Sequence, residues 1–179
     1  MTPADLAAMC ALAGLDVVAL TDHNTAGNCA AFCRAAQRNG LLALAGMELC
    51  TREEIHMICL FPTVQAAEGF SRQVARRLPP LKNRPELFGH QYYMDEWDLV
   101  LGEERAMLLA AADIGVGEAG ALAARFGGSY SESGEYPAWE YQKDSRLREV
   151  MVEVFEAQYG RKPVVEAIHA GLECGIFSD

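Results

Sequence analysis

Four side chains in the first third of the sequence have the chemistry of metal ligands: Asp22, His23, Glu48 and His56. Each lies at or near the end of a short apolar run, so a rigid element can hold each in place. Imidazole and carboxylate groups together bind Zn, Mn or Fe, and sites that combine them can activate water for hydrolysis. The residue types and their spacing therefore predict a hydrolytic site for divalent metal ions.

Three predicted strands position these groups. Residues 15–20, LDVVAL, form a short continuous apolar run that is typical of a buried strand in a parallel sheet. This strand delivers the sequence TDHN at its carboxyl end, where ligand sites gather in parallel α/β folds. Glu48 ends the run LLALAGME, and alternation within EIHMICLF directs His56 away from Ile55 and Met57. We therefore expect imidazole, carboxylate and imidazole to converge from adjacent elements.

Helices are predicted before and after the first strand. Residues 2–13 form one helix, which Thr2 can cap and Gly14 ends. Residues 25–39 form a second helix, which ends at Gly40. A strand, a helix and a strand in quick succession make a βαβ unit, so the sequence predicts an α/β fold with a parallel sheet.

The chain beyond the third strand is predicted to be mainly helical. Residues 64–78 are amphipathic, and residues 79–89 contain the prolines and glycine of a loop. Two further helices are predicted at residues 103–113 and 117–125.

His90 stands alone in a polar, aromatic stretch. A histidine in such a setting is more often a surface or supporting group than a metal ligand, and we interpret His90 in that way. Nearby, Tyr92, Tyr93 and Trp97 are candidates for a pocket wall, although aromatic side chains by default serve packing.

Residues 1–128 resemble the PHP family, named for polymerase and histidinol phosphatase. The resemblance rests on LDVVALTDHNT, on GMELCTREEIHMICLF and on the looser run RPELFGHQYYMDEWDLVLGEERAMLLAAADIGVGEAGALAARFGG. It implies a distorted (β/α) barrel, partial in this chain, and hydrolysis of a small-molecule phosphoester by metal-activated water. It also implies that His23, Glu48 and His56 are metal ligands and that Asp22 is a catalytic ligand or supporting group. The family's opening His-x-His, its later histidine and its closing Asp-x-His are absent from this sequence.

Residues 129–179 resemble a different family. After the polar linker SYSESG, the motifs YPAW and IHAGLECG are similar to the C-terminal part of aminoacyl-histidine dipeptidases of the M20 metallopeptidase family. This resemblance implies that His169 and Glu173 lie near a substrate cleft. The local pattern predicts a small α/β segment, with a helix at 146–159 and a strand in VVEAIHA.

The composition narrows the classes of function. Of the 179 residues, 51% are hydrophobic, which favours a globular fold, and the net charge of −10 disfavours a nucleic-acid partner. No apolar run reaches the length of a membrane span and the N-terminus has no signal pattern, so we expect a cytoplasmic protein. The six cysteines form no CxxC pair, which favours scattered buried thiols over a structural zinc site.

Three hypotheses for function remain open at this point. The first is a metal-dependent phosphoesterase of the PHP kind, carried by His23, Glu48 and His56. The second is an aminoacyl-histidine dipeptidase fragment, carried by His169 and Glu173. The third is a non-catalytic interaction fragment that self-associates through open sheet edges.

Overall fold

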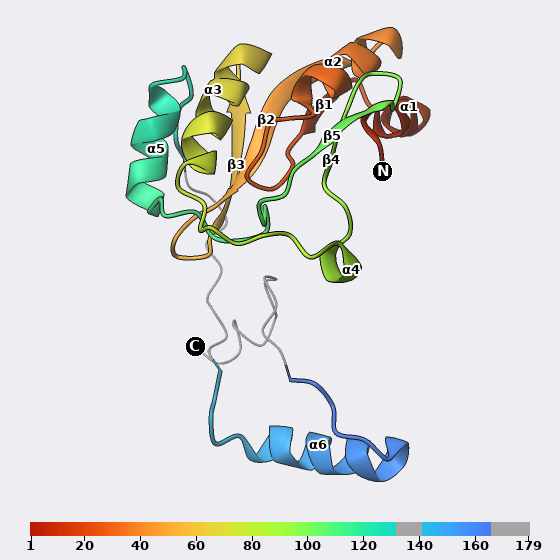
Figure 1. The fold of residues 1–179 in the computed structure, drawn as a ribbon, viewed down its shortest axis with the longest axis vertical. Helices are drawn as coiled ribbons and strands as arrows, with labels where there is room; N and C mark the ends of the chain where they lie inside the picture. Colours follow the sequence, from red (N-terminus) through yellow and green to blue (C-terminus); the bar gives the residue numbers. More distant parts are fainter. Residues whose placement is uncertain (132–140, 166–179) are drawn as a thin grey trace. The chain divides into compact units, whose positions relative to one another are not determined.

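The computed structural model describes residues 1–131 and 141–165 (Figure 1). The chain divides into two compact units, Met1–Tyr130 and Ser131–Asp179. Among the described residues, no helix is long and apolar enough to cross a membrane.

The first unit is built on a three-stranded sheet. Its strands, β1 (Val17–Leu20), β2 (Leu42–Cys50) and β3 (His56–Phe61), lie in sequence order. β1 pairs with β2 in parallel, and helix α2 (Cys29–Arg38) connects them, so the predicted βαβ unit is confirmed. β3 pairs with β2 in the antiparallel direction. This hairpin brings the start of β3 to the carboxyl end of β2.

A second, smaller sheet pairs β4 (Tyr92–Met94) with β5 (Val100–Glu103) in the antiparallel direction. The α/β class is therefore confirmed. The described strands do not close into a barrel, however, so the PHP-type barrel is not confirmed.

The N-cap predicted for the first helix is confirmed. Helix α1 (Pro3–Leu12) has Thr2 as its N-cap, whose hydroxyl accepts a hydrogen bond from the backbone of Asp5. Helix α3 (Val64–Ala75) is capped in the same way by Thr63. The loop predicted after α3 contains one short helix, α4 (Pro85–Phe88), and helix α5 (Val116–Ala124) is the helix predicted at 117–125.

The prediction of a helix at residues 103–113 is wrong. Residue Glu103 ends β5, and the segment that follows is irregular. Its backbone is held by distant groups: the N–H of Met107 donates to Leu81 and that of Ala112 donates to Cys50. These long-range hydrogen bonds replace the local ones of a helix, so tertiary context overrides the helical propensity of this alanine- and leucine-rich stretch.

The core lies between one face of the three-stranded sheet and helices α2 and α3. Its largest fully buried side chains include Phe32 from α2, Phe70 from α3, and Met47 and Leu49 from β2. The five cysteines of the described residues are free, and burial raises the pKa of both Cys29 and Cys59 to about 11. These thiols therefore behave as small core side chains.

Gly46 in β2 allows the hairpin to pack closely. A Cβ atom at this position would lie 2.6 Å from the carbonyl oxygen of Cys59 and 2.9 Å from Cδ2 of Leu60. The backbone oxygen cannot move without disturbing the β2–β3 pairing. We therefore expect Gly46→Ala to lower the free energy of unfolding by about 1–3 kcal/mol.

Urea unfolding followed by circular dichroism would measure this effect. Gly102→Ala is the matched control, because a Cβ at Gly102 in β5 meets no atom within 4 Å. Equal stability of Gly46→Ala and wild type would show that the hairpin is looser than described.

The described part of the second unit contains helix α6 (Arg146–Tyr159). The hydroxyl of Ser145 caps its start, and Gly160 ends it in the left-handed conformation at φ 68°. The predicted helix at 146–159 is thus confirmed. Most of the strand predicted after it, together with His169 and Glu173, lies outside the described residues.

Candidate metal centre

The structure brings together three of the predicted site residues: His23, Glu48 and His56. Each can offer one ligand atom such that the three atoms lie within 4.8 Å of one another. Nδ1 of His56 is 2.7 Å from Oε1 of Glu48, and Nδ1 of His23 is 3.6 Å from Oε2 of the same carboxylate. The two imidazole rings meet edge to face, with centroids 5.4 Å apart. Glu48 is therefore the central member of the cluster.

The sheet topology explains this convergence. His23 follows β1 and forms an isolated parallel bridge with Glu48, which extends the β1–β2 ladder past the end of β1. His56 is the first residue of β3 and pairs with Cys50, two residues beyond Glu48. Because alternate residues of a strand share a face, Glu48 and His56 project from the same side of the sheet.

The donor set fits a divalent cation. Two imidazole nitrogens and one carboxylate are ligands that Zn, Mn and Fe accept, and three protein ligands leave room for water or substrate. In addition, Nδ1 of His23 is buried and has no hydrogen-bond partner among the described residues. Since buried polar atoms are nearly always satisfied, this nitrogen has the surroundings of a metal ligand. The cluster can thus hold one ion. Its three side chains are not part of the hydrophobic core.

Asp22 lies beside this cluster rather than in it. Its carbonyl oxygen accepts a hydrogen bond from the backbone N–H of Glu48, which fixes the end of β1 against β2. Burial raises the pKa of Asp22, and a hydrogen bond from Asn28 and the neighbouring His23 partly offset this shift. The side chain lines the cavity described below.

Asn24 is a structural residue of the site that the sequence analysis did not single out. Its buried side chain donates hydrogen bonds to the carbonyl oxygens of Leu108 and Ala110, at 2.8 and 2.9 Å, and accepts one from the N–H of Cys50 at 3.0 Å. Its backbone N–H donates to the carbonyl oxygen of Glu48 at 2.8 Å. Asn24 therefore connects β1, β2 and the irregular segment after β5. Its partners are far away in the sequence, and only its place directly after TDH hinted at a role.

A cavity of about 370 Å³ adjoins the cluster, and His23 is common to both. Its polar lining includes Asp22, Thr25, Asn28 and Glu104, and its aromatic wall consists of Phe88, His90, Tyr92 and Tyr93. Of the three aromatic side chains predicted as candidates for a pocket wall, Tyr92 and Tyr93 line this cavity. The third, Trp97, does not: it is exposed and stacks under the guanidinium of Arg38.

Tyr93 is held rigidly in this wall. Its hydroxyl donates a 2.7 Å hydrogen bond to Glu104. Burial, together with this bond, raises the pKa of Tyr93 to about 12. The phenol is therefore neutral at physiological pH and acts as a hydrogen-bonding group.

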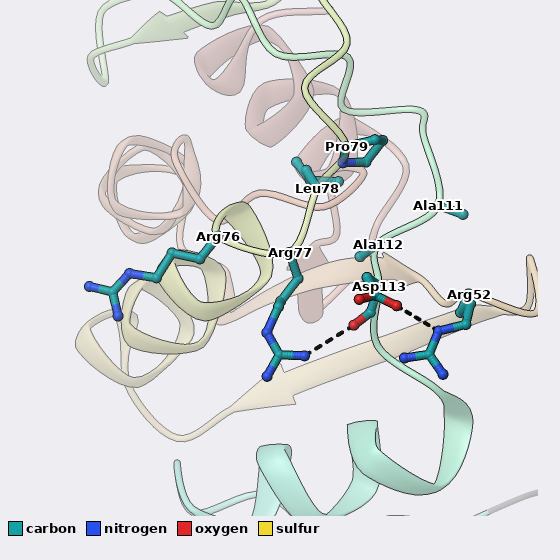
Figure 2. Close-up of a pocket in the computed structure, with 8 residues that line it drawn as sticks. All are labelled: Arg52, Arg76, Arg77, Leu78, Pro79, Ala111, Ala112 and Asp113. Carbon is teal, nitrogen blue, oxygen red and sulfur yellow. Dashed lines mark hydrogen bonds and ion pairs between the residues drawn. The ribbon is translucent and has the colours of Figure 1, made fainter.

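A second cavity of similar volume lies on another part of the first unit (Figure 2). Figure 2 shows Asp113 between Arg52 and Arg77, while Arg76 extends away from them. Arg52 forms a 2.7 Å ion pair with the Asp113 carboxylate, and Arg77 bonds the Asp113 carbonyl oxygen and Glu118. Two of the three arginines that line this cavity, Arg52 and Arg77, therefore have acidic partners.

The comparisons with known proteins give one partial likeness. The chain is 29% identical over 73 residues to the cytosol non-specific dipeptidase of Escherichia coli (strain K12), a match that covers 41% of this chain and 15% of the dipeptidase. No family model matches the chain. No solved structure gives a significant match.

Proposed function

We propose that the chain is a metal-dependent hydrolase of the PHP phosphoesterase kind, with His23, Glu48 and His56 as ligands of a divalent ion. The main support for this proposal is the convergence of two imidazoles and one carboxylate. The buried Nδ1 of His23, which has no hydrogen-bond partner among the described residues, adds to it. The ions that suit this donor set are Zn, Mn and Fe. The substrate is a small-molecule phosphoester.

The residues of the site have different roles in the proposed reaction. Glu48 lies between the two imidazoles and fixes the orientation of His56 through their 2.7 Å contact. Asn24 holds the strand ends that carry His23 and Glu48 in register. A divalent ion in such a site supplies Lewis-acid chemistry, which stabilises negative charge on a phosphoryl oxygen and makes water more acidic. The adjoining cavity then accommodates the ester group, with Asp22 and Asn28 as polar contacts and Tyr92 and Tyr93 as its wall.

A second candidate is the dipeptidase function, which the likeness to the E. coli protein favours. In this alternative His169 and Glu173 contact a dipeptide. The matched portion is 15% of that enzyme.

Turnover measurements distinguish the two functions. Metal-free protein would be incubated with Zn²⁺, Mn²⁺ or Fe²⁺ and either an aryl phosphodiester or a histidine-containing dipeptide. We expect metal-dependent hydrolysis of the phosphodiester only, and its loss in His56→Gln. Glu96→Gln is the control, since Glu96 pairs with Arg34 away from the site. Hydrolysis of the dipeptide alone would favour the second function, and folded protein without metal-dependent turnover of either would contradict both.

A further inference from the structure

His90, which lines the cavity that adjoins the metal centre, forms a second histidine–carboxylate pair with Glu103. Nδ1 of His90 is 2.7 Å from Oε1 of Glu103, and His90 and His23 line the same cavity. His90 is not a member of the metal cluster formed by the described residues. The proposed metal site therefore does not use His90.

The His90 ring is fixed from two directions. Besides the bond to Glu103, it stacks on the ring of Tyr92 with centroids 5.1 Å apart and an angle of 3° between the planes. Tyr92 and Glu103 are also direct partners in the β4–β5 pairing, so one small sheet supplies both restraints. No described residue bonds to the second ring nitrogen, Nε2, which is available to a molecule in the cavity.

A histidine whose Nδ1 is held by a carboxylate is a common arrangement for proton transfer. The carboxylate orients the ring by its contact with Nδ1 and leaves Nε2 as the nitrogen that exchanges a proton with a bound molecule. The second ring nitrogen is also the one that remains free here.

We propose that His90 is the catalytic acid of the reaction and that Glu103 is its positioning residue. This inference rests on the proposed phosphoester hydrolysis. Water adds to phosphorus, and the bond between phosphorus and the leaving oxygen breaks with its electron pair on that oxygen. Nε2 of protonated His90 gives its proton to the leaving oxygen, which departs as an alcohol. The attacking water loses a proton to solvent, and His90 regains one from solvent, so the overall reaction consumes one water.

The test uses esters that differ in their need for an acid. A 4-nitrophenyl phosphoester has a leaving group that departs without protonation, whereas an alkyl phosphoester of the same charge requires it. In His90→Ala we expect kcat/KM to fall about 100-fold or more for the alkyl ester and to change little for the aryl ester. Added imidazole should restore part of the lost activity. Glu103→Gln should show a smaller loss with the same preference, and Glu96→Gln should match wild type.

A measurement without turnover completes the test. In ¹⁵N spectra of metal-free protein, His90 should carry a proton on Nδ1, and Glu103→Gln should shift that nitrogen signal. An equal loss on both esters, or no loss, would overturn the role of His90 while leaving the proposed function intact. Absence of metal-dependent turnover in folded wild type would instead overturn both.

Discussion

Replacing Glu48 with glutamine is expected to lower the affinity of the protein for a divalent cation by about 100-fold or more, since even the loss of a group that only supports a ligand costs 10–100-fold. Glutamine has the shape of glutamate but no charge. Glu48 contacts both histidines of the cluster, at 2.7 Å for His56 and 3.6 Å for His23. Its loss therefore removes the anionic ligand and leaves two neutral imidazoles.

Calorimetric titration of metal-free protein with Zn²⁺ or Mn²⁺ would measure this change. Glu96→Gln is again the matched control, because it removes a carboxylate that pairs with Arg34 rather than with a histidine. Circular dichroism would verify that the variant is folded. If Glu48→Gln bound the cation as tightly as wild type, Glu48 would not be a ligand.

Replacing Asn24 with alanine is expected to lower the free energy of unfolding of the first unit by about 3–5 kcal/mol, since three backbone groups, one buried and two part-buried, each lose a partner. These groups are the carbonyl oxygens of Leu108 and Ala110 and the N–H of Cys50. Asn24 also has φ 51°, a left-handed conformation that asparagine tolerates better than alanine does. The segment after β5 would lose its anchor next to the metal ligands.

Thermal or urea unfolding would test this prediction. Asn24→Asp should be at least as destabilising as Asn24→Ala, because it retains the acceptor for Cys50 but places a buried carboxylate oxygen against the carbonyl oxygens of Leu108 and Ala110. Asn39→Ala is the control. The Asn39 side chain makes one part-buried hydrogen bond, to the carbonyl oxygen of Ala35, and the loss of this bond should lower the free energy of unfolding by under about 1 kcal/mol. Similar stability of the Asn24 and Asn39 alanine variants would show that the Asn24 bonds contribute nothing beyond an ordinary surface contact.

The elements that the sequence predicted are those whose signals are local. LDVVAL contains β1, helix α1 begins at the hydroxyl cap expected of it, and helix α6 occupies the predicted range. The proximity of His23 and Glu48 also follows from a local rule, because the carboxyl ends of two parallel strands meet at one edge. Position in the strand was enough to suggest which side chains converge.

The features that sequence reasoning missed depend on distant contacts. The helix predicted at 103–113 fails because Asn24, Leu81 and Cys50 bind its backbone groups from outside. The pairing of His90 with Glu103 depends on the β4–β5 sheet, and that sheet was not predicted. In both cases the deciding partner is separated in the chain, so neither composition nor periodicity carries the signal.

Anomalous X-ray diffraction tests the central claim most directly. Crystals of the protein grown with Zn²⁺ would be measured above and below the zinc absorption edge. We expect one anomalous peak, which marks a zinc ion about 2.0–2.2 Å from ligand atoms of His23, Glu48 and His56, the normal range for nitrogen and oxygen ligands of zinc. Ordered density for all three side chains without a peak between them would contradict it.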